Sequence, residues 1–127
     1  MNLPSKARVE AAPNFVASLA AAHAFLALQD EASADSRFGK LKAELRDMTA
    51  VLSWSPSAGR PARFLTARSA QARVRTETVR RLAEQTGLPS LREYVVSQHV
   101  VLYAHSDAEV VLLALKHQRQ LAYNADR

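Results

Sequence analysis

The sequence predicts an α+β fold in which an antiparallel helical hairpin packs on one side of a small antiparallel sheet of about four strands. The first half carries apolar residues at helical spacing in two neighbouring segments. The last third contains three short runs rich in β-branched and aromatic residues: Leu91–Val95, His99–Ala104 and Val110–Leu115. A turn at Ser106 and Asp107 makes the last two runs a hairpin. The 127 residues, 48% of them hydrophobic, suffice for a single domain over residues 1–127.

The N-terminal region predicts a short strand over residues 6–12 and then a helix that begins at Pro13, since proline suits the first turn of a helix. This helix is expected to end near Gln29. It contains no charged residue until Asp30 follows it. We therefore expect most of its circumference to be buried.

The second helix has the most regular apolar spacing in the chain. Ser33 is expected to cap its free N–H groups, with Asp35 in the first turn. Its apolar positions alternate steps of three and four residues: Phe38, Leu41, Leu45, Met48 and Leu52. The segment Pro56–Pro61 ends the hairpin, because two prolines and a glycine do not continue a helix.

A third helix is predicted over residues 69–85, with Gly87 supplying the left-handed position after its end. Its apolar content is thin, so we expect it to be peripheral. It carries four arginines: Arg73, Arg75, Arg80 and Arg81. The net charge is +5, and residues 60–92 hold eight arginines against two acidic residues. Such a local excess indicates either an anionic partner or a solvated helix face.

Several classes of site and location are not expected. The chain has no cysteine, which excludes disulfides and thiolate metal sites. No set of His, Asp and Glu has metal-ligand spacing and no glycine-rich phosphate loop occurs, so we expect neither a metal nor a cofactor. The alanine-rich run 11–28 is too short and too polar to span a bilayer, which predicts no membrane association and a cytoplasmic location.

Four features occur in a fixed order along the chain. They are a strand before a helical hairpin, the pattern Pro56-x-x-Gly59-Arg60-Pro61, the triplet Leu91-Arg92-Glu93, and a final hairpin that ends in Lys116-His117-x-Arg119. This ordered set resembles the RelE/ParE superfamily of toxins from type II toxin–antitoxin pairs. The resemblance covers nearly all of the chain except about residues 64–90. Family members usually pass from the Gly-Arg-Pro turn to the next strand in a few residues, so the basic helix is an insertion at about residues 66–88.

The resemblance implies a toxin that arrests growth and is held inactive by a cognate antitoxin. That antitoxin would combine a small DNA-binding part with an acidic, amphipathic segment that covers the toxin. On the toxin, the resemblance places target contacts at five positions: Arg60, Arg92, Lys116, His117 and Arg119.

The superfamily has two activities, poisoning of DNA gyrase and ribosome-dependent cleavage of messenger RNA. Cleavage needs a base, an acid and cations around the phosphate. The candidates for these roles are Arg92, Glu93, Lys116, His117, Arg119 and Tyr123. However, Val100 stands where ribonuclease members tend to carry an arginine, and no lysine occurs between Lys42 and Lys116. The Gly-Arg-Pro turn and the His-x-Arg ending favour the ParE-like branch, so gyrase is the expected target and RNA cleavage the alternative.

A third reading is a non-toxic nucleic-acid-binding module that uses the basic helix. It predicts an affinity that falls steeply with salt. Residues 65–90 lack the interleaved aromatic residues on which bases stack, which disfavours this reading. His105, beside the turn, is expected at the surface.

Overall fold

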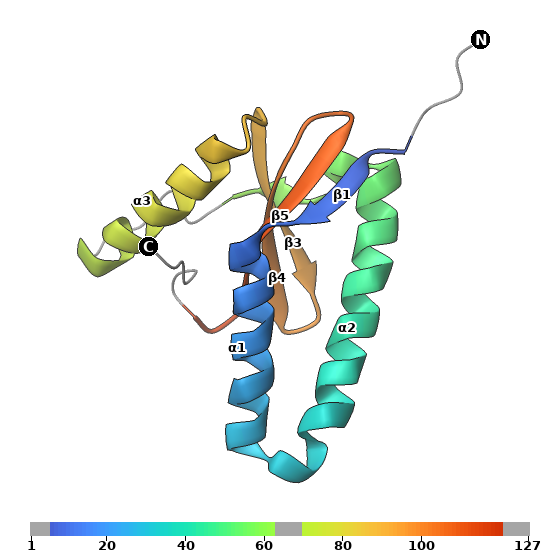
Figure 1. Ribbon diagram of the computed structural model, residues 1–127, viewed down its shortest axis with the longest axis vertical. Helices are drawn as coiled ribbons and strands as arrows, with labels where there is room; N and C mark the ends of the chain where they lie inside the picture. Colours follow the sequence, from blue (N-terminus) through green and yellow to red (C-terminus); the bar gives the residue numbers. More distant parts are fainter. Residues whose placement is uncertain (1–5, 63–69, 121–127) are drawn as a thin grey trace.

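The computed structural model describes residues 6–62 and 70–120, without the side chains at positions 70–73, 75 and 76. Figure 1 shows the elements in chain order. They are β1 (Arg8–Ala11), α1 (Pro13–Gln29), α2 (Glu31–Trp54), the 3-10 turn η1 (Pro56–Ala58), β2 (Arg60–Pro61), α3 (Ala70–Gln85), β3 (Ser90–Val96), β4 (His99–His105) and β5 (Glu109–His117). The predicted α+β class and helical hairpin are confirmed.

The described residues form one five-stranded sheet in the order β1-β5-β4-β3-β2. The neighbouring pairs from β5 to β2 are antiparallel, whereas β1 runs parallel to β5. The sheet is therefore mixed, and it has one strand more than the predicted four. The extra strand, β2, has only two residues, which is too short to leave a periodic signal in the sequence. It lies at an edge, where Pro61 removes no interior ladder hydrogen bond.

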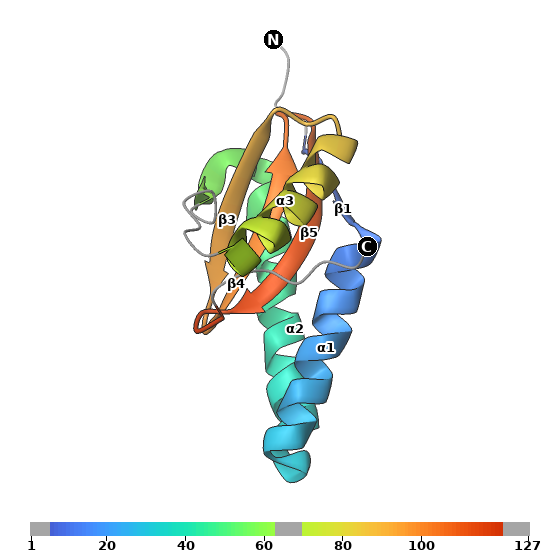
Figure 2. The same ribbon diagram turned by 90° about the vertical axis from the view of Figure 1, so that its left-hand side faces the viewer.

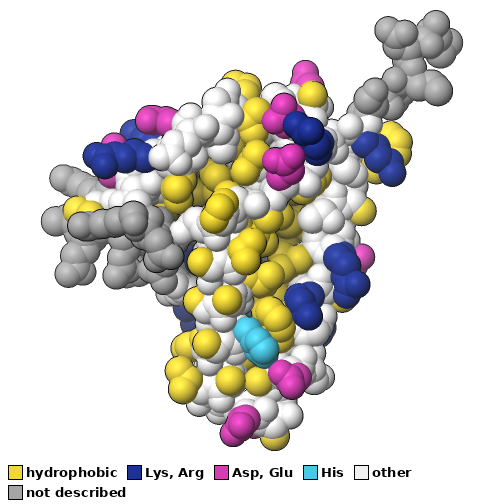
Figure 3. Space-filling model, in the orientation of Figure 1, with side chains coloured by type: hydrophobic (Ala, Val, Ile, Leu, Met, Phe, Trp, Pro, Cys, Tyr) yellow, Lys and Arg dark blue, Asp and Glu magenta, His cyan; other side chains and the backbone are white. Residues whose placement is uncertain are grey.

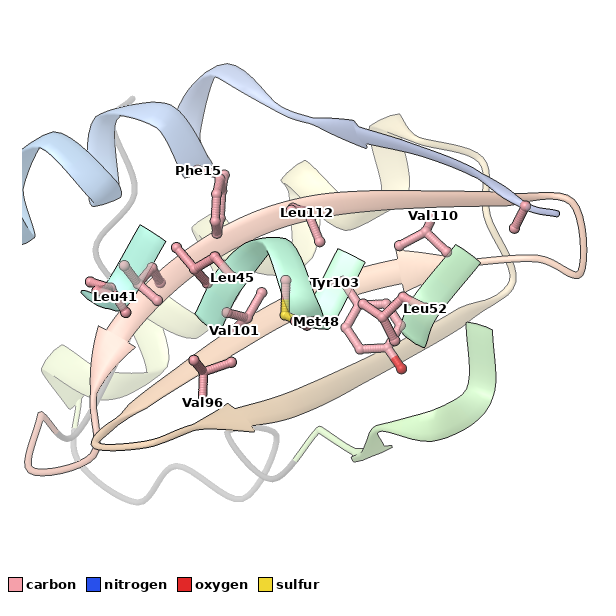
Figure 4. Close-up of a cluster of buried hydrophobic side chains, with 12 residues drawn as sticks. Phe15, Leu41, Leu45, Met48, Leu52, Val96, Val101, Tyr103, Val110 and Leu112 are labelled. Carbon is pink, nitrogen blue, oxygen red and sulfur yellow. The ribbon is translucent and has the colours of Figure 1, made fainter. Parts of the chain in front are cut away.

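The α1–α2 hairpin covers one face of the sheet. Apolar side chains of α1 and α2 meet the inward-facing residues of β3, β4 and β5 (Figure 4). The α2 contribution is the predicted stripe, with Leu41, Leu45, Met48 and Leu52 all buried. The predicted helical spacing is thus the spacing of a core face.

The other face of the sheet is covered by α3 (Figure 2). Val79 is 1% exposed, and it packs with Leu82 and Ala83 against Val100 and Leu102 of β4, among other residues. The prediction that α3 is peripheral is therefore wrong, and helices cover both faces of the sheet. Val79, Leu82 and Ala83 suffice to hold α3 on the sheet, because the sheet residues beneath them are themselves apolar.

The start of α2 differs from the prediction. Asp30 rather than Ser33 is the N-cap, because its carboxylate accepts a hydrogen bond from the N–H of Ala32 at 3.1 Å. The hydroxyl of Ser33 donates to the same carboxylate at 2.9 Å. Gly87 has a φ of 69°, as expected for the residue that follows the end of α3.

Much of the α1 surface faces outward. Phe15 and Leu26 are buried, but Val16, Phe25 and Leu28 are 56%, 53% and 86% exposed. Hydrophobic side chains accordingly gather over this helix and its seam with α2 (Figure 3). The prediction that most of α1 is buried is wrong, because absence of charge does not distinguish a core helix from a helix with an exposed apolar face. No helix in residues 6–62 and 70–120 has the length and hydropathy needed to cross a membrane.

Candidate functional site

The C-terminal end of β5 brings two histidines together. His117 is the register partner of His99 at the start of β4. Their ring centroids are 5.3 Å apart and the rings meet edge to face at 75°. Burial lowers the pKa of His99, the neighbouring His117 lowers it further, and the carboxylate of Glu44 on α2 acts in the opposite direction. His99 is thereby held in its neutral form at neutral pH.

A β-turn follows directly and brings the backbone N–H of Arg119 to the ring of His117. The N–H of Gln120 donates to the carbonyl of His117 at 3.0 Å, which closes the turn. The N–H of Gln118 donates to the carbonyl of Gln98 at 2.8 Å, which ties the turn to the β3–β4 connection. The arginine is exposed, so its guanidinium is available to an approaching partner.

Lys116 points away from His117 to the opposite face of the sheet. Successive strand residues alternate between faces. Lys116 pairs in register with Val100, which belongs to the cluster under α3, whereas Leu115 belongs to the cluster under the hairpin. Burial lowers the pKa of the Lys116 ammonium, and Arg60 lowers it further while Glu93 raises it. The electrostatic partners of Lys116 are therefore those on the α3 side.

Glu93 is a buried carboxylate on the same face, only 3% exposed. Arg60 is its register partner on β2, and the Arg60 Nε lies 3.7 Å from the Glu93 Oε1. That distance gives an ion pair but no hydrogen bond, and the Arg60 Nε has no hydrogen-bond partner. Glu93 thus lies near two cations, Arg60 and Lys116.

Arg92 lies on the hairpin face, where it joins an internal network. Its Nη1 donates to the carbonyl of Gly59 at 2.9 Å and its Nε donates to the Nε2 of His105 at 3.1 Å. The Nδ1 of His105 lies 3.0 Å from the carbonyl of Ser106. This arrangement fits the neutral tautomer with the proton on Nδ1. Arg92 therefore holds the turn before β2 against the sheet.

Tyr103 and His105 were not singled out as functional, and both are buried parts of this network. The Tyr103 hydroxyl donates to the carbonyl of Pro56 at 2.7 Å and accepts from the N–H of Gly59 at 2.9 Å. His105 is 6% exposed, so the prediction that it is a surface residue is wrong. Strand alternation from Val101 and Tyr103 would have placed it on the inward face.

The predicted site residues thus separate into three groups. His117 and Arg119 lie together with His99 at the end of β5. Arg60, Glu93 and Lys116 lie on the α3 face, and Arg92 lies in the network on the hairpin face. Tyr123 falls outside the described residues.

The structure describes the side chains of two of the four arginines of α3. Arg80 and Arg81 are exposed, and Arg81 Nε lies 3.8 Å from the Glu77 carboxylate in an i,i+4 ion pair. The side chains of Arg73 and Arg75 are among those that are not described.

The end of β5 offers two imidazoles and the exposed Arg119 to a partner. Such groups suit contact with an anion, either a carboxylate or a phosphate. Within residues 6–62 and 70–120, no three His, Asp or Glu side chains are grouped so that they would hold a metal ion. A scan against protein-family models found no match to this chain, and a search of curated proteins found no similar sequence.

Proposed function

We propose that this chain is the toxin of a type II toxin–antitoxin pair, acts in the cytoplasm, and arrests growth by poisoning DNA gyrase. The observation that carries the proposal is the position of the Lys116-His117-x-Arg119 ending. These residues stand at the end of β5, the second strand of the β4–β5 hairpin, in an α+β fold in which two helices pack on the sheet. This is the position that the RelE/ParE resemblance implies for them. Its exposed cation, Arg119, stands at the rim of the sheet.

Gyrase poisoning is favoured over RNA cleavage because the ribonuclease candidates on β3, Arg92 and Glu93, make contacts inside the protein. Glu93 is buried beside Arg60, so it does not meet the requirement that a general base reach its substrate proton. Arg92 donates to Gly59 and His105. Val100 is 2% exposed and lies under α3, so this position supplies no charge to a phosphate.

The partner in this proposal is an acidic, amphipathic antitoxin segment. Its apolar side would cover the exposed side chains of α1, which include Val16, Phe25 and Leu28. Its carboxylates would pair with exposed arginines such as Arg80 and Arg119. Co-expression of such a partner should restore growth.

The proposal is tested by tightly regulated expression in bacteria without a partner. Growth should stop on induction and a DNA-damage response should follow. The Arg119→Ala variant should be markedly less toxic, while the control Arg37→Ala, which removes an exposed arginine of α2, should remain as toxic as the wild type. Normal growth at high expression of folded protein would reject the proposal.

Ribosome-dependent RNA cleavage is the second candidate, and one observation favours it. The rings of His99 and His117 lie edge to face, 5.3 Å apart, and imidazoles are the side chains that most often transfer protons in catalysis. This candidate predicts truncated transcripts in a translation extract. It also predicts that replacement of either histidine abolishes their formation.

A further inference from the structure

The turn after β5 includes a hydrogen bond to the ring of His117. The backbone N–H of Arg119 donates to the Nδ1 of His117 at 3.1 Å. A ring nitrogen that accepts a hydrogen bond carries no proton, so the Nδ1 of His117 is unprotonated here. The backbone position of Arg119 is thereby fixed from the side chain two residues before it.

Further hydrogen bonds hold the same turn around His117 and Gln120. The N–H of His117 donates to the Oε1 of Gln120 at 2.8 Å. The Lys116 Nζ donates to the carbonyl of Gln120 at 3.1 Å. These contacts fix the two ends of the turn, and the Nδ1 contact is the one that holds its exposed middle at Arg119.

We propose that neutral His117 is a positioning residue: its Nδ1 fixes the turn so that the Arg119 guanidinium is presented to the target. Its importance for toxicity rests on the proposed function, whereas the positioning itself does not. The imidazole then acts as a hydrogen-bond acceptor, and the account requires no proton transfer to or from it.

Protonation of His117 would undo this arrangement. An added proton on Nδ1 would face the N–H of Arg119, so two donors would meet and the turn would open. The groups that bear on the pair are His99 on β4, Glu44 on α2, and the neighbouring Lys116 and Arg119.

Two substitutions separate positioning from ring chemistry. In His117→Asn the amide oxygen stands where Nδ1 stood, because both atoms are bonded to Cγ. In His117→Gln the amide oxygen instead approaches the position of Nε2. Hydrogen exchange of the Arg119 amide, followed by NMR in the purified full chain, reports the contact directly. We expect exchange about three- to tenfold slower in wild type and His117→Asn than in His117→Gln.

Acidification provides a second readout on the same samples. At a pH low enough to protonate imidazoles, protection of the Arg119 amide should be lower in the wild type and unchanged in His117→Asn, which has no imidazole at this position. Growth arrest by His117→Asn should be stronger than growth arrest by His117→Gln or by Arg119→Ala. Folding of each variant is checked by its circular dichroism spectrum.

The outcomes distinguish the proposal from the function on which it rests. Equal exchange of the Arg119 amide in the wild type and both variants would overturn the positioning role. Loss of toxicity in His117→Asn despite a protected amide would also overturn it, since the ring itself would then be needed. If no variant and no wild type arrests growth, the toxin proposal fails, and the exchange rates still decide whether His117 positions Arg119.

Discussion

The backbone N–H of Gly59 donates to the hydroxyl of Tyr103, 2.9 Å away, and this contact joins the turn after α2 to the centre of the sheet. The two residues are 44 positions apart in the sequence. A Cβ at Gly59 would lie 2.5 Å from the carbonyl oxygen of Glu93 and 2.7 Å from the Tyr103 hydroxyl. Glycine is thus required at position 59 because the backbone there passes too close to Glu93 of β3 and Tyr103 of β4 to leave room for a side chain.

Replacement of Gly59 by alanine should destabilise the protein. We expect a loss of about 1–3 kcal/mol in the free energy of unfolding, because the nearest obstacle is backbone and does not move away easily. Gly39→Ala is the control: nothing lies within 4 Å of its added Cβ. Since Gly39 lies inside α2, alanine there should stabilise by about 0.5–1 kcal/mol. Urea unfolding measures both, and equal effects would contradict the packing described.

The contact between α3 and the sheet gives a second prediction. Val79 is 1% exposed and Val74, on the same helix, is 52% exposed. Val79→Ala should cost about 2 kcal/mol of unfolding free energy, from lost apolar burial and the cavity left behind. Val74→Ala should change it by less than about 0.5 kcal/mol. Equal small effects on thermal unfolding would mean that α3 does not cover this face in solution.

Stability should depend on pH through His99. Its pKa is lowered in the folded state, mainly by burial and then by His117, so the unfolded state binds the proton more readily. Stabilisation by neutral His99 is present above about pH 6.5 and is lost as the pH falls below that value. His99→Asn should flatten this part of the stability profile measured by urea unfolding.

The role of His117 in this shift can be measured separately. The His117→Asn variant removes the neighbouring imidazole that lowers the pKa of His99, so that pKa, followed by NMR, should rise part of the way toward its ordinary value. An unchanged pKa of His99 would show that the two rings do not interact as the edge-to-face contact indicates.

Substitution of Arg92 should mainly reduce stability, whereas substitution of Arg119 should mainly reduce toxicity. Arg92→Lys loses the planar fork that reaches both Gly59 and His105, so we expect a cost of about 1–3 kcal/mol in unfolding free energy. Arg119→Ala should leave stability within about 0.5 kcal/mol of wild type and still reduce growth arrest. Thermal unfolding and growth curves measure the two effects. A stable Arg92→Lys protein with reduced toxicity would instead place Arg92 in the target contact.

Much of the fold could be predicted from local signals. The α2 stripe and the last three strands have strong periodicity, and both were located closely. The sequence did not reveal that α3 covers the second face, because Val79, Leu82 and Ala83 are few and their partners lie far along the chain. It also did not reveal that α1 is exposed, since an uncharged helix has no polar face that marks the solvent side.

The candidate site was harder to predict, for a geometric reason. Arg92 and Glu93 are neighbours in the sequence, as are Lys116 and His117, yet in a strand such neighbours point to opposite faces. A cluster that is continuous in the sequence is therefore divided in space. The turn after β5 then brings the backbone N–H of Arg119 back to the His117 Nδ1, 3.1 Å away.

Incubation of the purified chain with DNA gyrase, relaxed plasmid and ATP tests the central claim most directly. The account predicts that cleaved DNA covalently attached to gyrase accumulates after detergent is added, and that Arg119→Ala produces much less of it than the wild type. Uncleaved plasmid at every concentration of folded wild-type chain would contradict the account.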